Sequence, residues 1–177
     1  MKTVNDYINN PNVKIEYFET LPSTNAYLKE RAEELCEGAV VIAGNQTAGR
    51  GRFTRKFYSP ENSGIYMSIL LKPNFEGFDA TYITTLTAVA VSESVEKLAN
   101  KNTQIKWVND VLIKGKKICG ILTEGKIDPN TGKPIYIVLG IGINAFVPKG
   151  GFDEEIKDIA GAVFDSFDED LKNRLTA

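Results

Sequence analysis

Positive side chains are concentrated in one short stretch of the sequence. Residues 49–57 read GRGRFTRKF and place four cations within seven positions, Arg50, Arg52, Arg55 and Lys56. No Asp or Glu occurs between Glu37 and Glu61, although the whole chain carries a net charge of −2. Gly49 and Gly51 let backbone N–H groups approach an anion, and the forked donors of arginine match carboxylate or phosphate oxygens. The stretch predicts an anion-binding loop that is mobile until its ligand arrives.

Two other interpretations of this stretch stay open. A solvated basic loop that binds nothing would have the same residues. A nucleic-acid patch is less favoured, because the net charge is negative and only Phe53 and Phe57 alternate with the cations. The stretch is not a phosphate-binding P-loop, since the pattern GxxxxGK[ST] is absent.

A second polar group lies at residues 106–110, which read KWVND. Asp110 follows the end of a predicted strand, beside the amide of Asn109. A carboxylate in that place is suited to hold Mg²⁺ on triphosphate oxygens. The alternative is that Asn-Asp is only a turn signal. Trp107 by itself is expected to be a core residue.

A third group begins at the paired lysines Lys116 and Lys117, which enter an apolar strand. Such lysines are usually solvated, but one at the start of a buried strand can extend its ammonium group into a cleft. Gly120 within this strand, and the glycines of residues 140–144 (GIGIN), mark places where something approaches the backbone closely. Glycines at alternate positions predict a face on which a flat ligand lies.

The chain contains no histidine and two cysteines. Ser-His-Asp and Cys-His nucleophile systems are therefore excluded, and the commonest ligand of catalytic zinc is missing. Cys36 and Cys119 are expected to be small buried apolar residues. The N-terminus lacks the apolar run of a leader, and no apolar stretch is long enough to span a bilayer, so we expect a cytoplasmic location without a membrane partner.

The pattern of the remaining sequence predicts an α+β fold with a mixed sheet packed by helices, in one domain spanning residues 1–177. Helices are predicted from Ser23 to Gly38, from Asp79 to Lys101 and within residues 153–164. The second helix is expected to bury the side that carries Ile83, Leu86, Val91, Val95 and Leu98. Strands are predicted at residues 39–43, 65–71, 104–107, 111–113, 117–124 and 134–144, with hairpin turns at residues 114–115 and 128–133.

Taken together, the motifs resemble those of biotin protein ligases, also called biotin–[acetyl-CoA-carboxylase] ligases. They occur in the order Ser23-Thr24-Asn25, residues 46–52 (QTAGRGR) with Arg55, residues 106–110, residues 117–122 (KICGIL) and residues 140–144. The resemblance implies a catalytic domain related to class II aminoacyl-tRNA synthetases. It also implies an ATP-dependent ligase that uses Mg²⁺ and ATP to convert biotin to biotinyl-5′-AMP. Biotin is then passed to a lysine of a biotin carboxyl carrier protein, such as that of acetyl-CoA carboxylase.

The resemblance also implies a role for each matching residue. Biotin-binding residues would be Ser23, Thr24, Asn25, Gln46, Gly49, Arg50, Gly51, Arg52, Lys117 and Gly120. Residues that bind ATP or the adenylate would be Arg50, Arg52, Arg55, Phe57, Asn109, Lys117 and Asn144. Lys117 and Arg52 would be catalytic, and Asp110 would bind Mg²⁺.

The chain departs from the family pattern at three positions. Thr54 stands where the family usually has Gly, Phe57 where it has Trp, and Val108 where it has Pro. The family's C-terminal β-barrel and N-terminal DNA-binding helix-turn-helix are not found in the sequence, so no DNA partner is expected. Residues 168–177 begin like a capped helix but are shorter than the ~12 residues that an isolated helix needs, so we expect the natural chain to continue.

Two rival functions and the state of assembly stay open at this point. A lipoate ligase or octanoyl transferase shares the fold, although the GRGR and KWxND motifs favour biotin. A catalytically inactive biotin-binding module is the second rival. The residues do not decide between a monomer and a homodimer.

Overall fold

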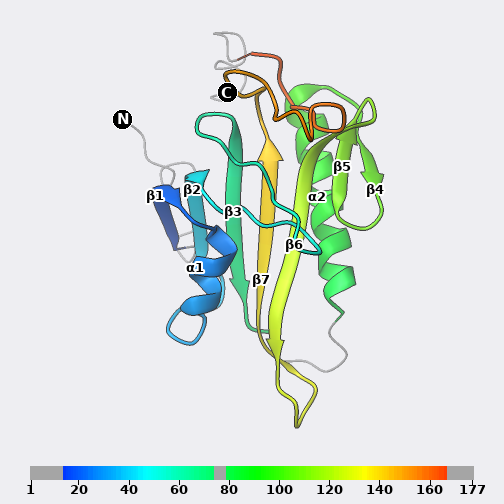
Figure 1. The fold of residues 1–177 in the computed structure, drawn as a ribbon. Coiled ribbons are helices and arrows are strands. Elements are labelled where there is room, and N and C mark those ends of the chain that lie inside the picture. The colour runs from blue at the N-terminus through cyan, green and yellow to red at the C-terminus, as the bar shows by residue number, and fades with distance from the viewer. Residues whose placement is uncertain (1–13, 74–78, 167–177) are drawn as a thin grey trace.

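The computed structural model describes residues 14–73 and 79–166, and within them seven strands form one mixed sheet (Figure 1). The strands are β1 Ile15–Leu21, β2 Val40–Gln46, β3 Gly64–Leu71, β4 Gln104–Lys106, β5 Asp110–Ile113, β6 Lys116–Ile127 and β7 Pro134–Asn144. Their order is β1-β2-β3-β7-β6-β5-β4, and every neighbouring pair in this sheet is antiparallel except β1–β2. The mixed sheet expected from the sequence is confirmed.

The two described helices cover opposite faces of the sheet (Figure 1). Helix α1, Thr24–Glu30, packs Leu28 against Leu70 and Val138. Helix α2, Ala80–Ala99, contributes to a second core that contains Cys119 and Ile141. Successive strand residues point to opposite faces, so β7 is buried from both sides and its apolar run supports both cores. The pocket described below lies on the α1 face.

Helix α2 begins at the predicted Asp79 cap, and its buried side agrees with the prediction at Val91 and Val95 but not at Leu86 and Leu98. Asp79 accepts a hydrogen bond from the backbone of Thr81 at 2.7 Å, and Asn100 ends the helix with a left-handed φ of 52°. The buried residues are the small side chains Thr84, Ala88, Val91, Val95 and Ala99. Leu86 and Leu98, expected inside, are 50% and 48% exposed. Small residues let the helix lie close to a sheet whose own isoleucines fill the interface.

The first predicted helix is shorter than expected, and one strand was not predicted at all. Helix α1 ends at Glu30, and residues 31–34 form turns. Strand β1 was missed because its side chains are only partly buried and show no clear apolar alternation. It lies at the edge of the sheet and depends on pairing with β2, which is distant in sequence. Neither described helix has the length and hydropathy required to cross a bilayer.

Both predicted hairpins between the later strands are confirmed. Lys114 and Gly115 connect β5 to β6 with φ angles of 49° and 77°, the pair of positive values that a tight hairpin turn requires. Residues 128–133 connect β6 to β7 and are closed by a hydrogen bond from Asp128 N to Lys133 O at 2.8 Å.

The helix predicted within residues 153–164 is wrong. Residues 154–159 form turns, and the chain then pairs with the start of β6. Lys117 N donates to Ile159 O at 2.7 Å, and Gly161 N donates to Lys117 O at 2.8 Å. These distant backbone bonds replace the bonds that a continued helix would make within itself. The predicted short helix at residues 168–177 lies outside the described residues.

The N-cap of α2 gives a direct test of this account. Asp79→Ala removes an acceptor for the helix's first backbone donors and should lower the free energy of unfolding by about 1 kcal/mol. Urea denaturation measures the change. Glu93→Gln, on an exposed side of the same helix, is the control and should leave stability unchanged. Equal losses from the two substitutions would contradict a capping role.

Candidate active site

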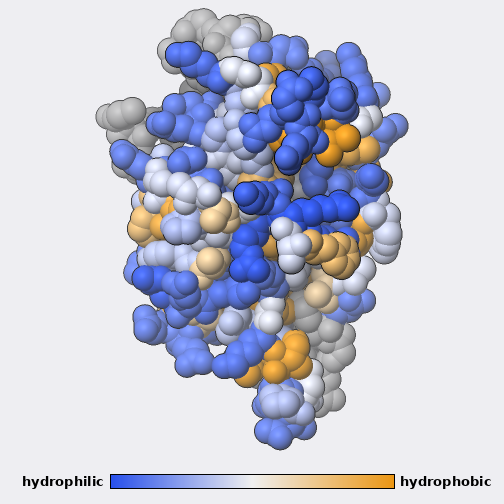
Figure 2. Space-filling view, viewed as in Figure 1, coloured by the Kyte–Doolittle hydropathy of each residue, from blue (hydrophilic) through white to orange (hydrophobic). Residues whose placement is uncertain are grey.

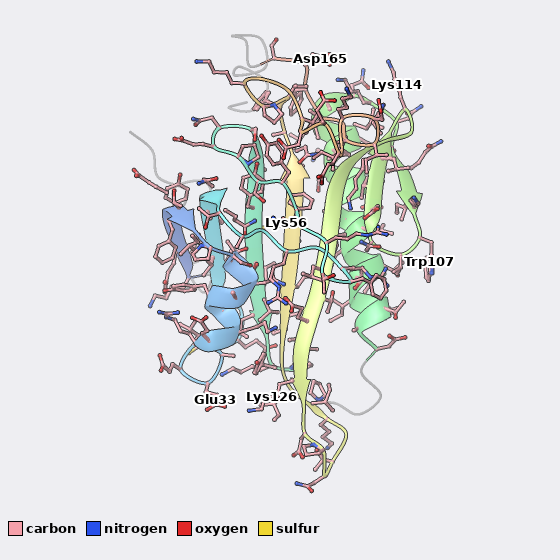
Figure 3. All side chains as sticks on the ribbon, viewed as in Figure 1. Glu33, Lys56, Trp107, Lys114, Lys126 and Asp165 are labelled. Atoms are coloured by element: carbon pink, nitrogen blue, oxygen red, sulfur yellow. The ribbon has the colours of Figure 1, made fainter. Side chains whose placement is uncertain are left out.

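The basic loop, defined as residues 47–63, connects β2 to β3 and extends across the α1 face of the sheet toward β6 (Figure 1). Lys56, labelled in Figure 3, lies on this crossing segment. Hydrophilic residues cover the middle of this face in Figure 2. A pocket lies among the loop, the start of α1 and strands β6 and β7. The predicted residues that line it are Ser23, Thr24, Asn25, Gln46, Arg50, Gly51, Arg52, Phe57, Asn109, Lys117 and Gly120.

Three glycines of β6 and β7, here called the glycine wall, line part of the pocket: Gly120, Gly140 and Gly142. Gly120 pairs with Gly142, and the neighbouring Gly140 pairs with Leu122, so the three glycines lie together. A Cβ on Gly140 would collide with the side chain of Asn25, and one on Gly142 would collide with the ring of Phe57. The predicted close approach is therefore present, and in this structure protein side chains make it.

Neutral polar groups gather at the start of α1. Ser23 is its N-cap, and Thr24 and Asn25 are buried in its first turn. Gln46 Oε1 accepts from Thr24 N at 2.9 Å and from Thr24 Oγ1 at 3.1 Å. Gln46 Nε2 donates to Ser59 Oγ at 3.0 Å, which fixes the orientation of the amide. Four of the predicted residues thus form one neutral end of the pocket.

Sequence reasoning missed Ser68, which completes this neutral end. The Ser68 side chain is fully buried, and its Oγ lies 2.6 Å from Asn25 Oδ1 and 2.7 Å from Thr24 Oγ1. A hydroxyl buried in this way needs partners, because an unpaired polar group in the interior costs about 1–3 kcal/mol. The signal was a single serine within the apolar strand IYMSILL at residues 65–71.

Three of the predicted cations, Arg50, Arg52 and Lys117, line the opposite end of the pocket, and each has a protein acceptor beside it. Lys117 Nζ lies 2.7 Å from Asp110 Oδ1. Arg52 Nη1 donates to Asn109 Oδ1 at 2.9 Å. Arg50 is 53% exposed and lies 3.6 Å from Glu124. The three cations are therefore distributed over separate acceptors of β5, β6 and the turn before β5.

Glu124 and Lys29 were also missed, and they join the two ends. Glu124 Oε2 accepts from Asn25 Nδ2 at 3.0 Å, and Lys29 Nζ lies 2.8 Å from Glu124 Oε1. Burial by itself would raise the pKa of Glu124, but the hydrogen bonds from Lys29 and Asn25, with the charges of Lys29 and Arg50, lower it below its usual value. The signal was the alternation that places residue 124 on the same face of β6 as Gly120.

Four predicted residues lie outside the pocket wall: Gly49, Arg55, Asp110 and Asn144. Gly49 shapes the base of the loop, because a Cβ there would strike the carbonyl of Phe57. Asn144 Nδ2 donates to Lys117 O at 3.4 Å and to Gly161 O at 3.0 Å. Its amide thus holds the backbone of Lys117 in place. Arg55 is exposed, and its carbonyl accepts from Gly51 N at 2.8 Å.

The residues around Asp110 fit Mg²⁺ only as a companion of substrate phosphates. Asp110 Oδ1 is shared between Lys117 Nζ and Asn109 Nδ2, at 2.7 Å and 2.9 Å. No group of three or more ligating side chains occurs within residues 14–73 and 79–166. Mg²⁺ commonly uses one or two carboxylates and takes its other ligands from phosphate and water. The donor set therefore fits a nucleotide-bound ion and not an all-protein site.

Two expectations about single residues are wrong, and one departure from the family pattern has a structural consequence. Trp107 is 72% exposed, and Figure 3 places it at the turn between β4 and β5, outside the core. Cys36 is exposed, whereas Cys119 is buried as expected, and burial raises the pKa of its thiol to about 12.

Thr54 has a φ of 64°, in the left-handed region that favours glycine.

Comparison with known proteins shows the family to which the chain belongs. A model of the biotin/lipoate A/B protein ligase family matches residues 17–144. The bifunctional ligase/repressor BirA of Bacillus subtilis is 41% identical over 145 residues, which are 81% of this chain and 44% of that protein. BirA of Escherichia coli is 36% identical over 124 residues, 70% of this chain and 38% of that protein. The chain spans less than half the length of these two relatives.

Solved structures agree with the sequence comparison. Biotin protein ligase from Aquifex aeolicus in complex with biotin and ATP superposes with a TM-score of 0.73 and 32% sequence identity. The match covers 92% of this chain and 66% of that chain.

The glycine wall can be tested by adding single methyl groups. Gly140→Ala should lower the free energy of unfolding by about 2 kcal/mol, because its Cβ meets a buried asparagine that cannot move without losing its hydrogen bonds. Gly120→Ala is the matched control. Its Cβ would lie 3.0 Å from the ring of Phe57 and 3.1 Å from the flexible end of Lys117, and both can shift. Thermal or urea denaturation compares the two variants, and equal stabilities would contradict the account.

Proposed function

Because this chain belongs to the biotin/lipoate A/B protein ligase family, we propose that it activates biotin with ATP and transfers the biotinyl group to a lysine of a biotin carboxyl carrier protein. The observation that carries the proposal is the pocket with two chemically different ends. Thr24, Asn25 and Gln46 supply neutral hydrogen-bonding groups at one end, and Arg52 and Lys117 supply positive charge at the other. Biotin has a neutral cyclic urea at one end and a carboxylate at the other, so it matches this division.

The cationic end suits the first chemical step. A biotin carboxylate oxygen attacks the α-phosphorus of ATP, the bond to the β-phosphate oxygen breaks, and pyrophosphate leaves with that electron pair. Attacker and target are both anionic, so repulsion and misalignment dominate the barrier. Arg50, Arg52 and Lys117 would reduce both effects by holding the oxygens of the two partners. No histidine is needed, because the carboxylate is already ionised at neutral pH.

Lys117 is the residue with the clearest expected part in this step. Its ammonium group is paired with Asp110 at 2.7 Å and is within reach of the glycine wall. In the proposed reaction it would exchange Asp110 for oxygens of the carboxylate and the α-phosphate. When bound with ATP, Mg²⁺ would neutralise phosphate charge, and Asp110 with Asn109 are the residues that would hold it.

The second step transfers biotin to the carrier. The unprotonated amine of the acceptor lysine attacks the carbonyl carbon of the adenylate, the bond to the phosphate oxygen breaks, AMP leaves, and the nitrogen loses its extra proton. Water would hydrolyse the same mixed anhydride. Closure of residues 48–58 over the intermediate would exclude it. A large Phe57 ring beside the glycines would contribute to that exclusion.

Biotin is preferred to lipoate as the substrate because of the relatives. The matched family includes both kinds of ligase. A Mycobacterium tuberculosis protein that is 36% identical over 69% of this chain carries the name biotin–[acetyl-CoA-carboxylase] ligase. The cytoplasmic location and the absence of a DNA partner stay predictions, and the choice between a monomer and a homodimer stays open.

The decisive experiment is to look for the intermediate. The 177-residue chain, incubated with biotin, ATP and Mg²⁺, should retain biotinyl-5′-AMP, and native mass spectrometry should detect the added mass. Omission of ATP or of biotin is the control. Retention of an adenylate only when lipoate replaces biotin would favour the lipoate ligase. Biotin binding without any adenylate would indicate the inactive binding module.

The part assigned to Lys117 has a neighbouring control. Lys117→Ala should reduce biotin-dependent exchange of pyrophosphate into ATP by about 100-fold or more, the size of effect seen when one stabilising donor is removed from a transition state. Lys116→Ala removes an adjacent charge whose Nζ contacts the carbonyl of Asp158. It should retain the wild-type rate. Similar rates for the two variants would remove Lys117 from the mechanism.

A further inference from the structure

Glu124 lies beside the neutral end of the pocket, and the proposed reaction assigns it no role. We propose that Glu124 is a positioning residue that orients the amide of Asn25 and, through it, the hydroxyls of Ser68 and Thr24, so that the pocket presents acceptors to the N–H groups of a cyclic urea. The inference deepens the proposed function and rests on it.

The contacts of Glu124 fix its own state and place. Its side chain is 17% exposed and lies between Lys29 Nζ at 2.8 Å on Oε1 and Asn25 Nδ2 at 3.0 Å on Oε2. Because these partners hold the pKa of Glu124 below its usual value, the group is ionised at neutral pH. An ionised carboxylate only accepts hydrogen bonds.

An acceptor at this position determines which way the Asn25 amide faces. Asn25 must turn its NH₂ group toward Glu124, and the same nitrogen donates to Leu122 O at 3.3 Å. Asn25 Oδ1 is thereby directed to Ser68 Oγ at 2.6 Å, over the bare backbone of Gly140. The side chain cannot be reversed without placing its carbonyl against a carboxylate.

The orientation of the Asn25 amide then determines which of the neighbouring hydroxyls donates its proton to which oxygen. Ser68 has one proton and two oxygen neighbours, Asn25 Oδ1 and Thr24 Oγ1. When that proton is given to Asn25, the one proton of Thr24 is shared between its 2.7 Å contact with Ser68 Oγ and its 3.1 Å contact with Gln46 Oε1. Gln46 Oε1 keeps its bond from Thr24 N at 2.9 Å in either case. Thr24 Oγ1 then has only lone pairs to offer to the pocket, which suits an N–H donor.

The ion pair with Arg50 is too weak to explain the placement of Glu124. Arg50 Nη2 lies 3.6 Å from Glu124 Oε1, and the arginine side chain is 53% exposed. Exposed pairs of this kind contribute about 0–1 kcal/mol. The effect of Glu124 should therefore fall on the binding of biotin and leave the binding of ATP and the chemical step unchanged.

Glu124→Gln tests whether Glu124 affects biotin binding alone. A glutamine amide can donate a hydrogen bond, so it would permit the Asn25 amide to exchange the positions of its oxygen and nitrogen. Calorimetry on the full 177-residue chain should show a Kd for biotin raised about tenfold, the loss of roughly one hydrogen bond to a charged group. In pyrophosphate exchange the KM for biotin should rise by the same factor, with kcat and the KM for ATP unchanged. A purely structural role would lower the active fraction and hence kcat, without this split.

Glu33→Gln is the matched control. Glu33 is an exposed acid 3.5 Å from Lys126, outside the pocket (Figure 3). The substitution removes the same charge and should leave both constants unchanged. Ser68→Ala interrupts the same chain of hydroxyls without changing charge. It should weaken biotin binding in the same direction, and it decides the matter if Glu124→Gln does not fold.

Three results would overturn the proposal. They are a Glu124→Gln variant that binds biotin as Glu33→Gln does, a KM for ATP that rises as much as the KM for biotin, and a Ser68→Ala variant with wild-type affinity. A wild-type chain that binds no biotin would instead refute the proposed function, so the two failures are distinguishable.

Discussion

Each cation of the pocket is matched by an acceptor that the protein itself supplies, and this matching governs how the site is built. Lys117 has Asp110, Arg52 has the amide of Asn109, and Arg50 has a long contact to Glu124. An incoming carboxylate or phosphate must compete with these groups, so part of the electrostatic attraction is lost in the exchange. In the proposed reaction the gain would be that the donors are already held near the position where charge develops, which would lower the cost of reorganisation.

The glycine wall leaves open space on the α1 face of the sheet, beside the paired charges. Gly120, Gly140 and Gly142 lie on neighbouring positions of β6 and β7, where side chains would otherwise fill the α1 face. Glycine weakens a strand, but β7 lies in the middle of the sheet and pairs with β3 over residues 137–144 and with β6 over residues 134–143. That pairing offsets the cost. Asn25 and the Phe57 ring can thus approach the backbone closely from opposite ends of the pocket.

Signals confined to a few neighbouring residues predicted their structures well. The cap at Asp79, the turn at residues 114–115 and the glycine pattern all act over a few positions, and eleven of the predicted site residues line one pocket. Features that depend on distant partners could not be read in this way. Ser68 and Glu124 are ordinary strand residues until folding brings them to Asn25, and residues 153–164 pair with β6 instead of continuing a helix.

Discrimination within the family must come from the neutral end. The acids used by biotin and lipoate ligases both carry a carboxylate, so Arg52 and Lys117 have no means to distinguish them. In the proposed complex a cyclic urea would offer N–H donors to the hydroxyl of Thr24, whereas an apolar dithiolane ring would offer none and would leave buried oxygens without a ligand partner. Sites built to hydrogen-bond a substrate reject an analogue that lacks the group far more strongly than apolar pockets reject a misfit. The orientation of the buried hydroxyls and of the Asn25 amide is therefore the physical basis on which substrate choice would rest.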